Sequence, residues 1–256
     1  MSVRVDPAMV PAALVDLTLR VGDPARDLVS LAEGNTSTVQ DGELVVKASG
    51  ARMDRASAGD FVVVDVDTAA RVLADPRTTQ DELSALLSVA DDPRGRRASI
   101  ETLVHVAAVH AGGATWVAHT HPTALVGLLS VEEGERLWQA PLFPDEAVVV
   151  GRPAWVGYEE PGLALGRAVA AAITDHADRY GTPPRLVLLG NHGIVALGRS
   201  PEEVEAVTTM AVKAARTRLI AHAVGRPRYL DAAGGDALAS RADEVARRAL
   251  LAGETV

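Results

Sequence analysis

Two histidines stand two residues apart in the segment WVAHTHPTAL (residues 116–125), between an apolar run and a proline. In a β-strand, side chains at positions i and i+2 point to the same face. His119 and His121 could therefore bind one divalent metal together through their ring nitrogens, as histidines bind zinc. The alternative is that both are hydrogen-bonded histidines without a ligand. The pair alone leaves both interpretations open.

A third candidate ligand is His192 in LLGNHGIVALG (residues 188–198), where Asn-His-Gly interrupts an apolar run. A polar group between two buried strands is costly unless it finds a partner. Three imidazole ligands leave one position on the metal open, as a catalytic site requires. The remaining histidines are expected within helices, at helix ends or facing solvent: His105, His110, His176 and His222.

A carboxylate near this set is Glu101, in RASIETLVH (residues 97–105). Ser99 is a plausible N-cap of a helix over residues 99–112, and Glu101 would then complete a capping box. In the functional interpretation, Glu101 points into the metal site as a ligand or as a general base on a carbon acid. His105 follows one helical turn later and could contact it. The local sequence does not decide between these roles.

An anion-binding loop is suggested by AEGNTSTVQDGELVVKASG (residues 32–50). Hydroxyls, small residues and backbone N–H groups of this kind form nests for anions, and Lys47 adds a positive charge. The P-loop pattern is absent. The alternative is two ordinary turns joined by a hairpin at Asp41-Gly42.

The composition limits the function classes. The chain has 256 residues, is 48% hydrophobic and carries a formal net charge of −9. An acidic chain is a poor general nucleic-acid binder, which needs a basic patch. The absence of cysteine excludes disulfides, Cys-ligated zinc and a thiol nucleophile. No apolar run is long enough for a membrane span and no signal-peptide pattern is present, so we expect a cytoplasmic protein.

The elements that would position these groups mix strands and helices without strict alternation. We expect strands over residues 42–50, 60–67, 115–121 and 146–151 and two within 185–198. We expect helices over residues 7–19, 27–32, 80–89, 99–112, 161–181 and 200–225. The polar segment 68–97 is interpreted as a mobile excursion from the core, and Asp145 and Glu146 as a turn before a strand. This pattern predicts an α/β layered domain with a central sheet.

The order of the motifs GNTS, KASG, ASIETLVH, HTHP and NHG resembles the class II aldolase/adducin family, over about residues 8–230. This family includes fuculose-phosphate and rhamnulose-phosphate aldolases, ribulose-phosphate 4-epimerases and adducin-like modules. The resemblance implies one three-layer α/β/α domain over residues 1–256 with a mainly antiparallel central sheet. It also implies a homotetramer with active sites at subunit interfaces.

The resemblance also assigns roles to residues. It implies that His119, His121 and His192 bind Zn²⁺ or another divalent transition metal. Glu101 is then the acid/base, and the fourth ligand when no substrate is bound. The substrate phosphate would be held by Asn35, Ser49, Gly50 and Ser99, with Lys47 nearby. Ile100 stands where related aldolases often have a second serine, which puts strict phosphate specificity in doubt.

The expected activity is that of an aldolase that cleaves a ketose 1-phosphate, or a related hydroxy-keto sugar, to dihydroxyacetone phosphate and an aldehyde. The metal would stabilise an enediolate, and Glu101 would move the proton at the carbon next to the carbonyl. A tyrosine would suit proton transfer at the aldehyde oxygen, with Tyr158 or Tyr229 as candidates. The alternatives are a dehydratase, decarboxylase or 4-epimerase on a related sugar phosphate or sugar acid, and a non-catalytic adducin-like binding module.

Overall fold

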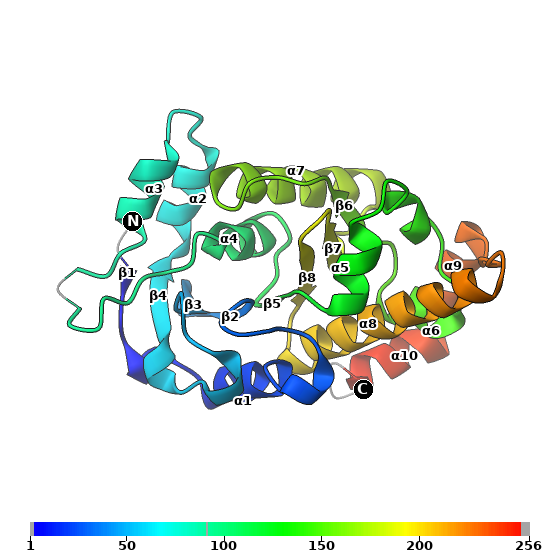
Figure 1. The fold of residues 1–256 in the computed structure, drawn as a ribbon, viewed down its shortest axis with the longest axis horizontal. Helices are drawn as coiled ribbons and strands as arrows, with labels where there is room; N and C mark the ends of the chain where they lie inside the picture. The colour runs from blue at the N-terminus through cyan, green and yellow to red at the C-terminus, as the bar shows by residue number, and fades with distance from the viewer. Residues whose placement is uncertain (1–2, 91, 252–256) are drawn as a thin grey trace.

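The centre of the fold is an eight-stranded sheet (Figure 1). A computed structural model describes residues 3–90 and 92–251. The strands lie in the order β1-β4-β3-β2-β5-β8-β7-β6, and neighbours are antiparallel except for β6 and β7. The strands are β1 (Val3–Arg4), β2 (Asn35–Gln40), β3 (Glu43–Lys47), β4 (Phe61–Asp65), β5 (Trp116–Thr120), β6 (Ala154–Val156), β7 (Leu186–Leu189) and β8 (Gly193–Gly198). The sheet is thus mainly antiparallel, as predicted.

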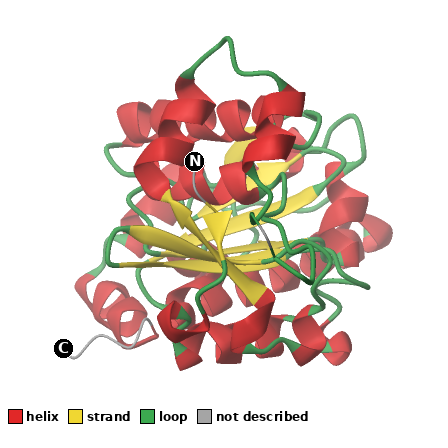
Figure 2. Ribbon diagram, turned by 90° about the vertical axis from the view of Figure 1, so that its left-hand side faces the viewer, coloured by secondary structure: helices red, strands yellow, loops and turns green. Residues whose placement is uncertain are grey.

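Helices cover both faces of this sheet (Figure 2). One layer contains α2 (Val66–Ala74), α3 (Gln80–Leu86), α4 (Thr102–His110) and α7 (Leu163–Tyr180). The other contains α1 (Ala12–Val21), α5 (Thr123–Leu129), α6 (Pro144–Val149) and α8 (Pro201–Val224). The last two helices extend this layer: α9 (Ala232–Ala239) packs against α6, and α10 (Ala242–Leu251) packs against α6, α8 and α9. The predicted three-layer α/β/α arrangement is confirmed.

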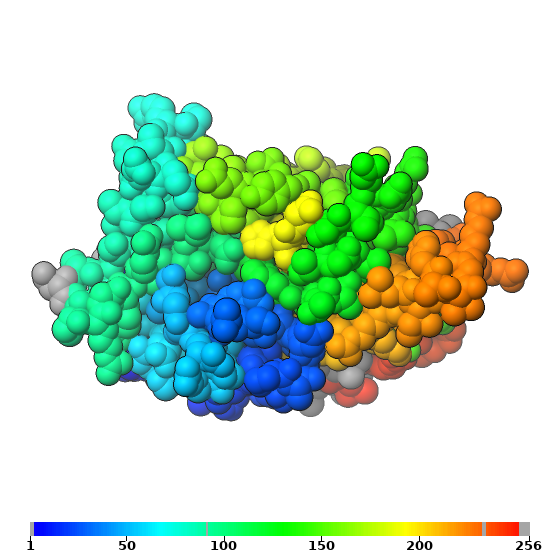
Figure 3. All heavy atoms as spheres, viewed as in Figure 1, coloured from blue at the N-terminus to red at the C-terminus, as the bar shows by residue number. Residues whose placement is uncertain are grey.

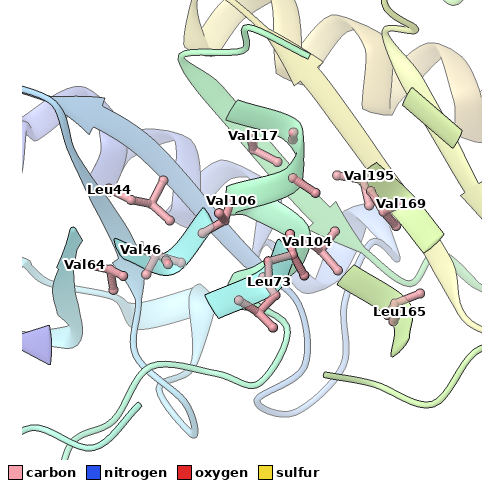
Figure 4. Packing of buried hydrophobic residues seen from close by; sticks show 14 of the residues in the cluster. Leu44, Val46, Val64, Leu73, Val104, Val106, Val117, Leu165, Val169 and Val195 are labelled. Atoms are coloured by element: carbon pink, nitrogen blue, oxygen red, sulfur yellow. The ribbon is translucent and has the colours of Figure 1, made fainter. Parts of the chain in front are cut away.

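The alternation of side chains along the strands builds a core on each face. Leu44 and Val46 of β3 point toward α2, α4 and α7, whereas Val45 between them joins a cluster with α1. Figure 4 shows the first of these cores, in which strand valines meet Val104 and Val106 of α4. Both faces of the sheet are therefore buried, and functional groups are confined to the strand ends and loops.

One predicted strand is wrong. The segment expected as a strand over residues 146–151 begins instead within the helix α6 (Pro144–Val149). A run of three valines favours a strand, but Pro144 at the first helical turn, followed by two acids, favours a helix start. The buried Glu146 then forms an ion pair with Arg218 of α8, which fixes the helix from a distant part of the chain.

Two further predictions are also corrected. Residues 27–32 form a loop rather than a helix, because Asp27 and Leu31 have positive φ angles of 55° and 53°. The segment 68–97 is part of the core rather than an excursion, because Leu73, Leu83 and Leu87 are buried in the α2–α4–α7 cluster. The helix within it was predicted correctly, as α3 shows a capping box between Thr79 and Glu82.

The strand register brings the polar motifs to one end of the central strands. Asn35 at the start of β2 lies opposite His119 near the end of β5, and His119 lies opposite Val195 of β8. The turn between β7 and β8 begins at this same end, and its Asn191 is exposed. Figure 3 shows yellow atoms, the colour of this stretch of the chain, on the surface near the centre of the view. This end of the sheet holds the candidate site.

Candidate metal centre

His119 and His121 come from the end of the central strand β5. His119 is 0% exposed, and His121 follows the last strand residue. Their Nε2 atoms are 3.0 Å apart and their ring centroids 4.7 Å apart. The structure therefore brings together the two imidazoles that the spacing placed on one face.

His192 and Glu101 complete the cluster from other elements. His192 lies in the β7–β8 turn, and its Nε2 is 3.0 Å from Oε1 of Glu101. The other carboxylate oxygen of Glu101 is 3.5 Å from Nε2 of His119. One potential ligand atom from each of Glu101, His119, His121 and His192 lies within 4.8 Å of the others.

Glu101 occupies this place because α4 begins two residues later than the predicted N-cap at Ser99 implies. The first helical residue is Thr102, and Glu101 is itself the N-cap position, with no side-chain capping bond. The expected capping box at Ser99 is therefore wrong. Ser99 Oγ instead accepts a hydrogen bond from the backbone N–H of Glu101 at 3.2 Å. The Glu101 carboxylate is left to face the histidines.

Gly193 allows the β7–β8 turn to approach β5. A Cβ atom at this position would lie 2.4 Å from the carbonyl oxygen of Thr120 and 2.6 Å from Cδ2 of His121. Both distances are too short for ordinary contacts. The glycine of the NHG motif is thus needed for His192 and His121 to lie side by side.

Two outer hydrogen bonds orient the imidazoles. Nδ1 of His119 donates to the carbonyl oxygen of Ile194 at 2.9 Å, and Nδ1 of His121 lies 3.2 Å from a carboxylate oxygen of Glu33. With a proton on Nδ1 and none on Nε2, each of the two rings can offer its Nε2 lone pair to a cation that lies between them. Three imidazole nitrogens with a carboxylate are donors that suit a divalent transition metal.

Electrostatics within the cluster keep Glu101 ionised. Burial opposes its charge, but His119 and His192 outweigh burial and hold the pKa of Glu101 well below its ordinary value. Burial also disfavours charge on His119, yet Glu101 raises the pKa of His119. Burial, together with the charge of His119, lowers the pKa of His121 to about 3. The site therefore combines an anionic carboxylate with a neutral imidazole at His121, which is the form that binds metals.

The predicted phosphate-binding residues lie in three nearby segments. The isolated bridge between Ala48 and Ala98 aligns the loop of Ser49 and Gly50 with the segment that leads to Ser99. Ser49 and Gly50 are exposed, and Ser99 is half-buried. Asn35 is buried, and its Nδ2 donates to Oε2 of Glu101 at 3.5 Å. The structure thus brings Asn35 to the metal cluster, while the role of all four in phosphate binding stays a prediction.

Lys47 holds two loops together. Its side chain is 2% exposed, and Nζ donates to the carbonyl oxygens of Ala51 at 2.6 Å, Ala48 at 3.3 Å and Ala32 at 3.5 Å. An ammonium group has three donors, and these carbonyls use all three. Burial lowers the pKa of Lys47 to about 8. The geometry favours a role in shaping the anion-binding loops, and direct contact with phosphate stays a prediction.

The tyrosine candidates differ in their surroundings. Tyr158 follows β6 and is 64% exposed, and its backbone N is 3.1 Å from a Cβ built on Gly190, two residues before His192. Tyr229 instead follows α8, and its hydroxyl lies 3.3 Å from His222. Tyr158 is therefore the tyrosine whose backbone lies beside the turn that carries His192.

The sequence did not reveal every residue of the site. Glu33 had no expected role, because an acid in a loop 88 positions from its partner His121 gives no local signal. His176 was expected to face solvent, but it is buried and bonded to the carbonyls of Thr182 and Arg152. His110 is the last residue of α4, at the helix C-terminus where it was expected, and His222 is exposed, as expected.

Comparison with known proteins agrees with this geometry. The profile of the family described as Class II Aldolase and Adducin N-terminal domain matches residues 13–219. The chain therefore belongs to the class II aldolase/adducin family. No curated protein matches it in a sequence search.

Solved structures share the fold at low identity. L-fuculose-1-phosphate aldolase from Thermus thermophilus is 22% identical, with 85% of this chain and 95% of that chain covered and a TM-score of 0.60. YgbL from Klebsiella pneumoniae, described as an aldolase, epimerase or decarboxylase, is 22% identical, with 96% and 99% covered and a TM-score of 0.63. The class II aldolase domain of a Thermoplasma acidophilum protein is 18% identical, with 81% and 92% covered and a TM-score of 0.62.

Among the described residues, no helix combines the length and the apolar character that crossing a membrane requires.

Proposed function

We propose that this protein is a zinc-dependent aldolase that cleaves a ketose 1-phosphate, or a related hydroxy-keto sugar, to dihydroxyacetone phosphate and an aldehyde. The observation that carries this proposal is the convergence of three imidazoles and one carboxylate within 4.8 Å at the end of β5. Membership of the class II aldolase/adducin family supports it. The presence of all three histidines argues against a non-catalytic module, which has no need of them.

Glu101 is the acid/base of this proposal. A divalent cation held by His119, His121 and His192 would supply Lewis-acid stabilisation of negative charge on a substrate oxygen. In the condensation direction, the ionised Glu101 takes a proton from the carbon next to the carbonyl. That deprotonated carbon then forms the new C–C bond to the aldehyde. In the cleavage direction, the C3–C4 electron pair stays on C3, and Glu101 returns the proton to C3. Its low pKa and its contacts with two imidazoles keep it ionised before condensation.

The phosphate group would lie at the loop of Ser49 and Gly50. The exposed position of this loop next to Ser99 supports the assignment, because serine hydroxyls can donate hydrogen bonds to phosphate. Asn35 would line the same pocket from the metal side. Ile100, in place of a second serine, leaves one fewer hydroxyl. This substitution is the specific observation that favours a second candidate: the same centre acting as a dehydratase, decarboxylase or epimerase on a related sugar acid or sugar phosphate.

Tyr158 would donate a proton to the aldehyde oxygen in condensation and accept it in cleavage. We propose a homotetramer in which a neighbouring subunit covers this side of the site. Two large apolar side chains support a covered surface: Tyr158 at 64% exposure and Leu31, between Leu28 and Glu33, at 81%. A phosphorylated substrate would be retained inside the cell, which fits a cytoplasmic enzyme.

Metal content and product release test the proposal together. The purified protein should contain about one zinc per chain and release dihydroxyacetone phosphate from at least one member of a panel of ketose 1-phosphates. Bound metal without release, but with turnover of sugar acids, would replace the aldolase with the second candidate. Failure to bind any divalent metal after reconstitution would refute both. Sedimentation velocity tests the tetramer.

A further inference from the structure

A buried histidine lies directly beneath the metal centre and has no place in the proposed reaction. His105 is on α4, one turn after Glu101, and is 0% exposed. Its Nδ1 is 2.7 Å from Oγ of Ser37, and its Nε2 forms a short hydrogen bond with Oδ1 of Asn35. Ser37 and Asn35 are both residues of β2, so the ring links the helix to the sheet.

The chemistry of the partners fixes the protons of this ring. Oδ1 of an asparagine can only accept, so Nε2 of His105 must carry the proton and donate it. Burial, together with the charge of His119, lowers the pKa of His105 to about 3, so the ring is neutral. Nδ1 is then a lone-pair acceptor, and the Ser37 hydroxyl donates to it.

The same bond fixes the amide of Asn35. With Oδ1 turned toward His105, Nδ2 faces Glu101 and donates to Oε2 at 3.5 Å. The flipped amide would place Oδ1 against the ionised Glu101 carboxylate, and two acceptors repel each other. The chain Ser37–His105–Asn35–Glu101 therefore has one consistent arrangement.

We propose that His105 is a positioning residue, which holds the Asn35 amide in the orientation that fixes the Glu101 carboxylate between His119 and His192. Glu101 is thereby held at both oxygens, at 3.0 Å from His192 and at 3.5 Å from both Asn35 and His119. The inference rests on the proposed role of Glu101 at the metal centre. Partners behind metal ligands typically change metal affinity or activity about 10- to 100-fold when they are removed.

Zinc affinity of matched variants tests this role without any substrate. His105→Leu removes both bonds, whereas His105→Gln keeps a donor for Asn35 and an acceptor for Ser37. A chelator-competition titration should show an affinity about 10- to 100-fold weaker for His105→Leu and within about fivefold of wild type for His105→Gln. His176→Leu is the control, because His176 is also a buried helical histidine, but its ring nitrogens bond the backbone carbonyls of Thr182 and Arg152 rather than a residue of the metal cluster. It should change the unfolding temperature and leave zinc affinity unchanged.

Two results would overturn the inference: a folded His105→Leu variant with wild-type zinc affinity, or a loss of equal size in His176→Leu. If His105→Leu does not fold, the Ser37→Ala variant tests the proposal instead. It removes only the first donor of the hydrogen-bond chain, from Ser37 to His105, and should weaken zinc binding about threefold or more. Wild-type affinity in Ser37→Ala would then refute the proposal. A wild-type protein that binds no zinc would instead refute the proposed function.

Discussion

Replacing Gly193 with alanine should distort the metal centre by steric overlap alone. The added Cβ would meet the Thr120 carbonyl at 2.4 Å and Cδ2 of His121 at 2.6 Å, each about 1 Å short of ordinary contact. Thr120 pairs with Ile194 in the β5–β8 ladder, so the backbone has little room to yield. Overpacking of this kind costs about 1–3 kcal/mol. For a chain of this size, we expect the melting temperature to fall by roughly 2–12 °C.

The clash should also affect metal binding, because the His121 ring can move more easily than the backbone carbonyl of Thr120. A displacement of about 1 Å at a site of this kind can cost on the order of a hundredfold in activity. Differential scanning fluorimetry with and without zinc, together with a competition titration, would measure both effects. Gly127→Ala in α5 is the control, because a Cβ there meets nothing within 4 Å, and a helix gains up to about 1 kcal/mol from alanine. A Gly193→Ala variant that matches the wild type in melting temperature and zinc affinity would refute the argument.

Four further predictions concern charged and polar side chains. Glu101→Gln should retain zinc but lose about a hundredfold or more in kcat; wild-type turnover would remove Glu101 as the base. His121→Ala should keep the circular dichroism spectrum of the fold and lose stoichiometric zinc, and full zinc retention would contradict the three-histidine assignment. Because burial lowers the pKa of Lys47 from 10.5 to about 8, its protonation opposes folding below that pH. In denaturant titrations, the free energy of unfolding of the wild type should therefore rise by about 3 kcal/mol relative to that of Lys47→Met between pH 8 and 10.5. If the free energies of the two proteins change in parallel with pH, the lowered pKa of Lys47 is refuted. Arg218→Met should cost about 3–5 kcal/mol in urea unfolding by stranding Glu146, and adding Glu146→Gln should recover part of that loss.

Local patterns predicted much of this protein. His119 and His121 could be paired because the two-residue period of a strand is a property of the backbone. The helix α8 was predicted because Ser200 caps it and two acids occupy its first turn. The order of the motifs gave the family resemblance. The fold that this resemblance implies is confirmed by the sheet and the two helix layers.

The failures share a cause in contacts between distant residues. Val148–Val150 has the composition of a strand, but α6 is fixed by a buried ion pair between Glu146 and Arg218, 72 positions apart. Likewise, the loop before Asn35 owes its path to a bond from the N–H of His121 to the carbonyl of Leu28. No local window of sequence contains these partners, so neither could be predicted from spacing.

The long separation of the site residues has a consequence for the lifetime of the protein. Glu101 and His192 are 91 positions apart, and Glu33 and His121 are 88 apart. A partly unfolded chain therefore lacks the complete ligand set, and a metal would bind the native state in preference. At a free-metal concentration about one hundred times the Kd, this linkage would add about 2.7 kcal/mol to the free energy of unfolding. Metal supply would then govern how rapidly proteases degrade the chain as well as how fast it turns over substrate.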